Sequence, residues 1–368
     1  MKHFNLNDQP DELLMGQSAL SNRFTSCPDQ RCYDITYEGR ALRIKEREKG
    51  IETLWFLFIQ SDQLRLEWAG SSSEYPETTE LLAAIEAAVV NYPHQQKISL
   101  QVPGGEIQTL FDSGVLIKNE NNQLVVYVDA FWQQVGVWCS AKSAQVFPIH
   151  YVFSQGRSHP LRPPKPVGKV YQRYIPWLGR TLAFRVIDAE TDLRRFNRWM
   201  NDPVVANFWQ EEGDMSKHLD YLAAIEADPH VIGLIGCFDD EPFGYFEIYW
   251  AKEDRLSPYY DVNDFDRGWH VLIGESHMRG KPFVTAWLPS ISHYLFLDDD
   301  RTQRLVIEPR IDNNKMIRNL EKCGYINIKE FDFPHKRAVL GMLSRERFFA
   351  EQRWVPRHVS PPQSVSMF

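Results

Sequence analysis

Cysteine is scarce in this sequence, with five residues in 368, and it shows no paired pattern. Only Cys27 and Cys32 lie close together along the chain, and no group of histidines and cysteines has the spacing of a zinc site. We therefore expect reduced thiols, no metal and a cytoplasmic enzyme.

Long apolar runs and an excess of positive charge are also missing. The most apolar stretch, at 81–90, is interrupted by Glu86, whereas a membrane-crossing helix needs about 20 apolar residues. The first residues, MKHFNLNDQPDELL, lack the apolar centre of a secretory signal. The 41 lysines and arginines against 49 acidic residues give a net charge of −8. The sequence thus predicts a globular protein with neither membrane nor nucleic-acid partners, and its acidity is compatible with a small cationic substrate.

The length predicts about two domains, and proline marks the division between them. Five prolines fall between 160 and 176, where they disfavour helix and favour an extended connector. We expect an N-terminal α/β accessory domain at 1–155, a proline-rich linker at 156–177, a catalytic domain at 178–350 and a poorly ordered tail at 351–368.

The N-terminal part predicts strands and a helix but carries no catalytic constellation, so we expect a structural or dimerising unit. Strands are predicted over 55–59, 63–68, 97–102, 115–118 and 123–128, with a turn at Ser61 and Asp62. Apolar spacing predicts a helix over 80–90, with Thr78 or Thr79 as its cap.

The C-terminal part alternates more clearly between strands and helices. Strands are predicted over 182–186, 231–237, 242–250, 269–273, 304–307, 325–331 and 338–343. Helices are predicted over 191–200, 216–227, 283–297 and 315–323, with Ser216 capping the second.

A loop between the strand at 269–273 and the helix at 283–297 has the features of a phosphate-binding site. Backbone N–H groups at a helix start converge on one point and favour negative charge. Gly280 allows a ligand to approach closely, and Pro282 suits the first helical turn. We expect a phosphate or diphosphate to contact this loop and the start of the helix at 283–297, through Ile273, Ser276, His277, Met278, Arg279, Gly280, Lys281, Pro282 and Phe283. Asn313 and Met316, near the start of the helix at 315–323, are the other residues expected to contact the cofactor. The alternative is an ordinary loop with surface cations.

The segment after the strand at 304–307 carries a second signal, since Asn313 caps a helix that Gly324 ends before Tyr325. This order of strands, helices and glycines is found in GNAT acyltransferases. More specific strings are WMNDP at 199–203, GYFE at 244–247, EDRL at 253–256, PYYD at 258–261, GWH at 268–270, RTQR at 301–304 and FPHKRA at 333–338.

Over 184–349 these strings resemble the siderophore-biosynthesis N-acyltransferases, the aerobactin-type N-hydroxylysine acetyltransferases and their N-hydroxydiamine relatives. The resemblance implies a GNAT fold, with a mixed, largely antiparallel sheet flanked by helices, in an α/β (α+β) protein. A degenerate GNAT-like unit is one candidate for the N-terminal domain. It implies acetyl-CoA or succinyl-CoA as donor, an N-hydroxylated lysine or diamine as acceptor, and a hydroxamate as product. An amine N-hydroxylase and a siderophore synthetase are the implied functional partners. The alternatives are a GNAT enzyme for ordinary amines and a non-catalytic CoA-binding module.

The chemistry of such a transfer needs a base near neutral pH. An N-hydroxyamine is less basic than an ordinary amine and arrives largely neutral, so the enzyme positions it and removes one proton. His270, in the strand before the phosphate loop, is the candidate base, and a carboxylate beside it would stabilise the imidazolium. Asp312 and Glu308 both follow the neighbouring strand; we favour Asp312.

The acceptor pocket needs an apolar wall and negative charge. Trp199, Phe208, Trp209, Tyr249 and Trp250 are candidates for the wall, and Glu247 and Asp254 for the charge. The alternative for each aromatic residue is core packing.

Other polar residues have simpler expectations. His277, His293 and His335 are expected at surfaces or caps, and 298–300 in an exposed turn. The basic run at 333–337 either meets CoA phosphates or forms a solvated turn.

Overall fold

A computed structural model describes residues 23–60, 63–70, 75–103, 107–140, 147–154 and 156–356. The expected turn at Ser61 and Asp62 and the expected tail from 357 onward lie outside these residues. Within them, no helix has the length and apolar character needed to cross a membrane.

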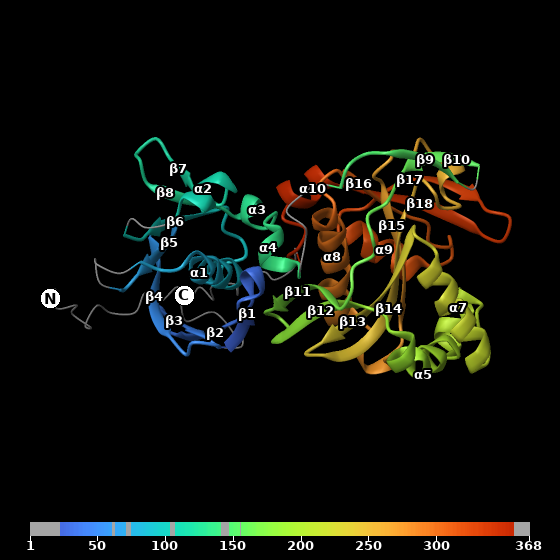
Figure 1. The fold of residues 1–368 in the computed structure, drawn as a ribbon, viewed down its shortest axis with the longest axis horizontal. Coiled ribbons are helices and arrows are strands. Elements are labelled where there is room, and N and C mark those ends of the chain that lie inside the picture. Colours follow the sequence, from blue (N-terminus) through green and yellow to red (C-terminus); the bar gives the residue numbers. More distant parts are fainter. Residues whose placement is uncertain are drawn as a thin grey trace, which may run out of the picture.

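Two eight-stranded sheets form the two halves of the molecule (Figure 1). The first has the order β1-β2-β3-β4-β5-β6-β8-β7. Its elements are β1 (Arg23–Ser26), the 3-10 turn η2 (Pro28–Gln30), β2 (Tyr33–Glu38), β3 (Ala41–Glu46), β4 (Glu52–Gln60), β5 (Gln63–Trp68), α1 (Thr78–Asn91), β6 (Lys97–Gln101), α2 (Gln108–Asp112), β7 (Ile117–Lys118), β8 (Leu124–Tyr127), α3 (Val128–Phe131) and α4 (Val135–Trp138).

The second sheet has the order β11-β12-β13-β14-β15-β16-β18-β17. Its strands are β11 (Lys169–Ile175), β12 (Arg180–Val186), β13 (Val231–Phe238), β14 (Glu241–Trp250), β15 (Arg267–Ile273), β16 (Arg304–Ile307), β17 (Ile326–Asp332) and β18 (Arg337–Ser344). Its helices and 3-10 turns are α5 (Ala189–Met200), α6 (Pro203–Trp209), α7 (Met215–Ala227), η3 (Ser257–Tyr259), η4 (Ser276–Met278), α8 (Lys281–Asp298), α9 (Asn314–Lys322) and α10 (Arg345–Ala350).

The two sheets repeat one topology. In each, the fifth and sixth strands of the order are parallel, β5 with β6 and β15 with β16, while the other neighbours are antiparallel. A long helix joins the parallel pair in both sheets, α1 in the first and α8 in the second. The predicted α/β class with mixed sheets is confirmed, and the N-terminal half has the strand order expected of a degenerate GNAT-like unit.

Helices cover the second sheet on two faces because side chains alternate along its strands. Tyr245 and Leu272 pack against α5, α6 and α7, whereas Phe246 and Trp269 join the core that includes α8. His270 therefore points to the same face as Leu272, toward α5–α7.

The proline-rich stretch at 156–177 contains strands. A separate hairpin pairs β9 (Tyr151–Ser154) with β10 (Arg157–Pro160), and β11 pairs with β12, so the second sheet begins inside this stretch. Phe24 of β1 stacks on Tyr174 of β11 with ring centroids 4.8 Å apart. The two halves thus share one hydrophobic core rather than meeting through a bare connector.

Several local expectations are wrong. Cys27 and Cys32 form a disulfide instead of staying reduced. Asp214, not Ser216, caps α7, because its side chain accepts from the Lys217 N–H. The helix over 80–90 begins at Thr78, so neither threonine lies at its N-cap position, which Glu77 occupies.

Two polar residues expected at the surface are buried. His293 of α8 is fully buried. Its Nε2–H donates to the Trp132 carbonyl at 2.6 Å, and its Nδ1 lies 2.8 Å from the Tyr171 hydroxyl. Asp299 is 8% exposed and ion-paired with Arg301, so 298–300 is not a simple exposed turn.

Candidate active site

An opening in the second sheet positions the candidate site. Within the described strands, β15 and β16 pair only at Arg267 with Leu305 and at Gly268 with Val306. His270 lies two residues after Gly268 on β15, and Glu308 lies two residues after Val306, just past the end of β16. Both side chains therefore point to the same face of the sheet. The strands therefore separate just where these two side chains face one another.

His270 lies between two carboxylates. Its Nε2 is 2.8 Å from Glu308 Oε1, and its Nδ1 is 3.5 Å from Glu247 Oε2. Glu247 sits directly opposite His270 in the antiparallel pairing of β14 with β15. The Glu308 side chain is fully buried, whereas that of His270 is 23% exposed, so the imidazole is the accessible member of the group.

The two carboxylates control the protonation of His270. Burial alone would lower the pKa of His270, but the negative charges of Glu308 and Glu247 outweigh it and raise the pKa to about 10. Burial would raise the pKa of Glu308, but the imidazolium, Lys336 and Arg255 hold it well below its ordinary value. In the free protein at neutral pH the pair is an ion pair, which differs from the expected base with a pKa near neutrality.

Tyrosine hydroxyls complete the hydrogen bonding of both carboxylates. Tyr249 donates to Glu308 Oε2 at 2.9 Å, and its ring centroid is 4.9 Å from that of His270. Gly268 makes this possible, because a Cβ there would lie 2.2 Å from the Tyr249 ring. Tyr221 and Tyr245 both donate to Glu247 Oε1.

Lysine 336 was missed as a site residue. Lys336 Nζ donates to the Glu308 carbonyl at 2.8 Å and lies 3.6 Å from Glu308 Oε1. Burial lowers the pKa of Lys336. The string FPHKRA forms a turn in which the Phe333 N–H donates to the Lys336 carbonyl, and Pro334 and His335 are exposed. The Lys336 side chain instead contacts Glu308, a partner that only the β16–β18 pairing brings close.

The structure does not bring Asp312 to His270. The Asp312 carboxylate is bound by the guanidinium of Arg310, at 3.1 Å and 2.6 Å, and its side chain is 59% exposed. The preference for Asp312 over Glu308 as partner is therefore wrong. Extending the alternation of β16 by one residue would have favoured Glu308.

The expected phosphate loop leads from β15 through η4 into α8. Gly280 caps α8 with φ 111°, and the space where a Cβ would stand is open. Arg279 is held at 2.9 Å by the Ile273 carbonyl and at 3.1 Å by Asp202, so it is already engaged within the protein. The side chains of Ser276, His277, Lys281 and Pro282 are exposed.

The remaining members of the expected loop set have structural contacts. Met278 is fully buried, and Phe283 packs edge-on against Phe238 at 5.5 Å. The Asn313 side chain accepts from the Met316 N–H at 3.3 Å and so caps α9, as expected.

The candidate wall residues separate into three groups. Tyr249 and Trp209, whose ring is 6.4 Å from that of His270, line the site. Trp199 is a core residue at 1% exposure, whereas Phe208 is 40% exposed. Trp250 lies on the opposite face of β14 from Tyr249, between Arg162 and Arg267.

Of the two candidate charges, Glu247 contacts His270 directly. Asp254 caps the turn at Leu256 with a 2.8 Å contact. Burial, and next the negative charge of Glu308, raise the pKa of Asp254, while His270 lowers it, so Asp254 belongs to the same electrostatic group.

Comparisons with known proteins agree with this architecture. Residues 188–333 match the family described as acetyltransferase (GNAT) domain. The chain is 39% identical over 320 residues to N(6)-hydroxylysine O-acetyltransferase of Escherichia coli, covering 86% of this chain and 98% of that protein. It is 46% identical over 197 residues to an N(5)-hydroxyornithine:cis-anhydromevalonyl coenzyme A-N(5)-transacylase of Beauveria bassiana, covering 52% of this chain and 43% of that one.

Among solved structures, an uncharacterised protein of Bacillus halodurans is 27% identical and covers 52% of this chain and 96% of its own, with a TM-score of 0.49. The likeness over nearly the whole Escherichia coli protein decides the family. The chain belongs to the GNAT-superfamily N-acyltransferases of siderophore biosynthesis, and it is an acyl-CoA-dependent acyltransferase.

Proposed function

We propose that the protein transfers an acetyl group from acetyl-CoA to the hydroxylamino nitrogen of an N-hydroxylated lysine or diamine, forming a hydroxamate. The observation that carries the proposal is the His270–Glu308 pair at the point where β15 and β16 separate. The names of the Escherichia coli and Beauveria bassiana relatives support the N-hydroxyamine class of acceptor.

In this proposal His270 is the base. The nitrogen attacks the thioester carbonyl, a C–N bond forms and the C–S bond breaks. CoA leaves as a thiolate, which takes up the proton that the nitrogen has given to His270 and so becomes the free thiol. Glu308 holds the Nε2–H at 2.8 Å, so the proton from the nitrogen is accepted at Nδ1, whose contact with Glu247 is longer at 3.5 Å. Both carboxylates stabilise the imidazolium that results.

Acyl-CoA would lie along the opening, with its diphosphate at the N-terminus of α8. The open space beside Gly280 and the exposed Lys281 support this placement. Trp209, Tyr249 and Glu247 would then contact the acceptor, and Asp254 would add negative charge beside it.

We also propose separate roles for the two halves of the chain. The chemistry belongs to the second sheet and its helices, whose boundary should be moved from 178 to Lys169 because β11 pairs with β12. The first half serves as an accessory unit. The acyl-CoA donor supports a place for the enzyme in the cytoplasm, where an amine N-hydroxylase would make its acceptor and a siderophore synthetase would use its hydroxamate.

The test is a direct comparison of acceptors and donors. The purified chain is incubated with acetyl-CoA or succinyl-CoA and with either N6-hydroxylysine, N-hydroxycadaverine or lysine, and CoA release and hydroxamate mass are measured. Turnover with an N-hydroxyamine and little with lysine is expected. Faster transfer to the ordinary amine would refute the acceptor, and preference for succinyl-CoA would refute the donor.

A further inference from the structure

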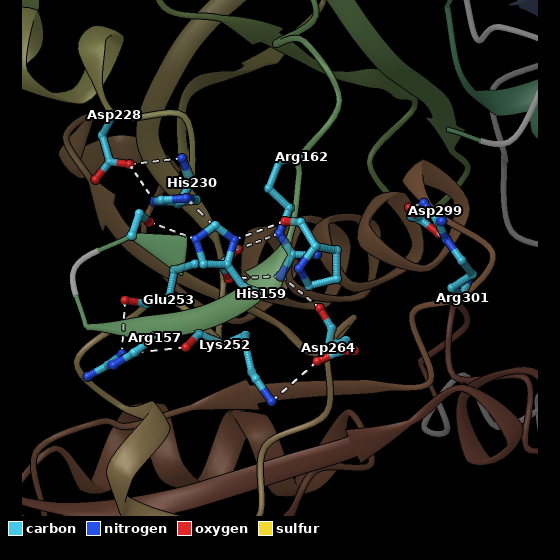
Figure 2. Close-up of polar contacts among 12 residues, drawn as sticks. Arg157, His159, Arg162, Asp228, His230, Lys252, Glu253, Asp264, Asp299 and Arg301 are labelled. Atoms are coloured by element: carbon cyan, nitrogen blue, oxygen red, sulfur yellow. Dashed lines mark hydrogen bonds and ion pairs between the residues drawn. The ribbon is translucent and has the colours of Figure 1, made fainter. Parts of the chain in front are cut away.

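A second cluster of ligand-type side chains lies outside the His270 site. His159 of β10, His230 just before β13 and Glu253 just after β14 come together from three separate segments (Figure 2). They are 2%, 9% and 9% exposed. One nitrogen or oxygen of each lies within 4.8 Å of the others.

The two imidazoles direct ring nitrogens at the same carboxylate oxygen. His159 Nδ1 is 2.9 Å and His230 Nε2 is 3.9 Å from Glu253 Oε1. Ligand atoms bound to one cation at about 2.0–2.1 Å in a tetrahedral site are roughly 3.3 Å apart, and these two distances bracket that value.

In each histidine, the ring nitrogen that faces away from Glu253 also has a polar contact. His230 Nδ1 lies 3.2 Å from Asp228 Oδ1, and His159 Nε2 is 2.7 Å from the Ser154 hydroxyl. A carboxylate or hydroxyl on the far nitrogen fixes the ring orientation and the tautomer, which is the arrangement found behind metal-bound histidines. For His230 it leaves the Nε2 lone pair facing Glu253.

We propose that His159, His230 and Glu253 form a binding site for one divalent cation of the Zn²⁺ class. Two imidazoles and one carboxylate suit such a cation and disfavour Mg²⁺, which takes mainly oxygen ligands. The Pro160 carbonyl oxygen, 2.9 Å from His159 Nδ1, or a water takes the fourth position.

Glu253 is already ion-paired with Arg162, so a bound cation has to displace part of this contact. Arg162 Nε is 2.6 Å from Glu253 Oε1 and its NH2 is 2.8 Å from Oε2. The cation replaces the Nε contact on Oε1, while the second contact persists. Arg162 retains its bond to the Asp264 carbonyl at 2.7 Å and its place 4.1 Å above the Trp250 ring.

A cation bound at this site would link the β9–β10 hairpin to the second sheet. His159 belongs to that hairpin, whereas His230 and Glu253 flank the β13–β14 pair. A ligand that binds the folded state and not the unfolded state stabilises it in proportion to the logarithm of its concentration. The melting temperature is therefore expected to rise as Zn²⁺ is added.

The test measures Zn²⁺ binding to the full chain, freed of metal by chelation, in competition with a chromogenic chelator. One Zn²⁺ per chain is expected, with no binding of Mg²⁺ at the same concentration. His159→Gln and His230→Gln should each abolish it, while the exposed His94→Gln is the matched control and should bind normally. X-ray absorption at the zinc edge should report two nitrogen ligands.

Asp228→Asn keeps all three ligands and alters only the support of His230, so it separates ligand loss from misfolding. Its Zn²⁺ affinity should fall about 10–100-fold with an unchanged circular dichroism spectrum. Zinc binding that survives in both histidine variants, or the absence of stoichiometric binding to the wild-type chain, would overturn the proposal.

Discussion

At the scale of single residues, charge decides the behaviour of the site. His270 gains its high pKa from Glu308 and Glu247, so removing one carboxylate changes both the geometry and the proton affinity of the imidazole. Asp312 is a natural control, because it is a carboxylate four residues from Glu308 whose partner is Arg310.

We predict that Glu308→Gln lowers kcat/KM by about 10²-fold or more, because it removes the group that orients and stabilises the imidazolium. Asp312→Asn should retain near-wild-type activity. CoA release measured with a thiol reagent checks both variants. Equal losses in the two would contradict the assignment of Glu308.

The pH dependence of kcat/KM tests His270 as the base. Below a pKa of about 10 the free enzyme holds the imidazolium, so the reactive neutral form increases as pH rises, and kcat/KM should climb through pH 7 to 9. Glu308→Gln weakens the attraction for the proton, so its profile should level off at lower pH. A wild-type profile that is flat over this range would exclude His270 as the base.

Some of the site could be predicted from the sequence and some could not. His270 and the neighbouring strand were identifiable, because a strand followed by a glycine-bearing loop and a helix is a local pattern. The alternation of β16 favours Glu308 over Asp312, but its contact with His270 depends on the parallel register of β15 and β16, which joins distant segments. Lys336 and the tyrosines on Glu247 reach the site through pairings that no local spacing reveals.

At the scale of elements, α1 buries a charged residue within its apolar sequence. Glu86 interrupts the apolar run of this helix and is nevertheless 3% exposed, with the Ser26 hydroxyl donating to it. Burial raises the pKa of Glu86 to about 8, against an ordinary value of 4.5. The folded protein therefore binds this proton more tightly than the unfolded chain does.

We predict that this carboxyl destabilises the fold as pH rises from 4.5 to 8, by up to about 1.4 kcal/mol per pH unit. Glu86→Gln imitates the protonated form, so it should be more stable than the wild type at pH 8 and nearly equal to it at pH 5. Urea unfolding at the two pH values measures the difference. A variant less stable at pH 8 would contradict the buried, protonated carboxyl.

Elements with strong periodicity were predicted closely, and short ones were not. β16 has the predicted bounds, and α8 and α5 begin within two residues of theirs. β1, β2 and β3 were not predicted, although β2 and β3 alternate apolar and polar residues, and α1 packs against all three strands. β11 was taken for part of a connector because prolines surround it, yet pairing with β12 holds it in the sheet.

At the scale of the whole molecule, His293 links the two halves. It lies on α8, yet its ring contacts the carbonyl of Trp132 from the first half and the hydroxyl of Tyr171 from the second sheet. Burial lowers the pKa of His293 to about 3. Since the unfolded chain takes up this proton near pH 6.5, the stabilising contribution is present above that pH and is lost as pH falls toward 3.

We predict that the free energy of unfolding decreases below pH 6.5 in one transition that includes both halves. His293→Gln should lose about 1–3 kcal/mol at pH 7 and should show a shallower pH slope between 6.5 and 4. The exposed His94→Gln should leave slope and stability unchanged. Scanning calorimetry is the measurement, and two well-separated transitions in the wild type would contradict the shared core.

The short pairing of β15 with β16 has a dynamic consequence. Two residue pairs form a narrow seam between the five strands from β11 to β15 and the three from β16 to β18. Amide hydrogens beside the seam should exchange with deuterium faster than those of the neighbouring β13–β14 ladder, whose eight pairs hold both strands along their length. A pantetheine arm lying in the gap would bridge the two blocks, and the exchange rates at 269–273 should then slow selectively.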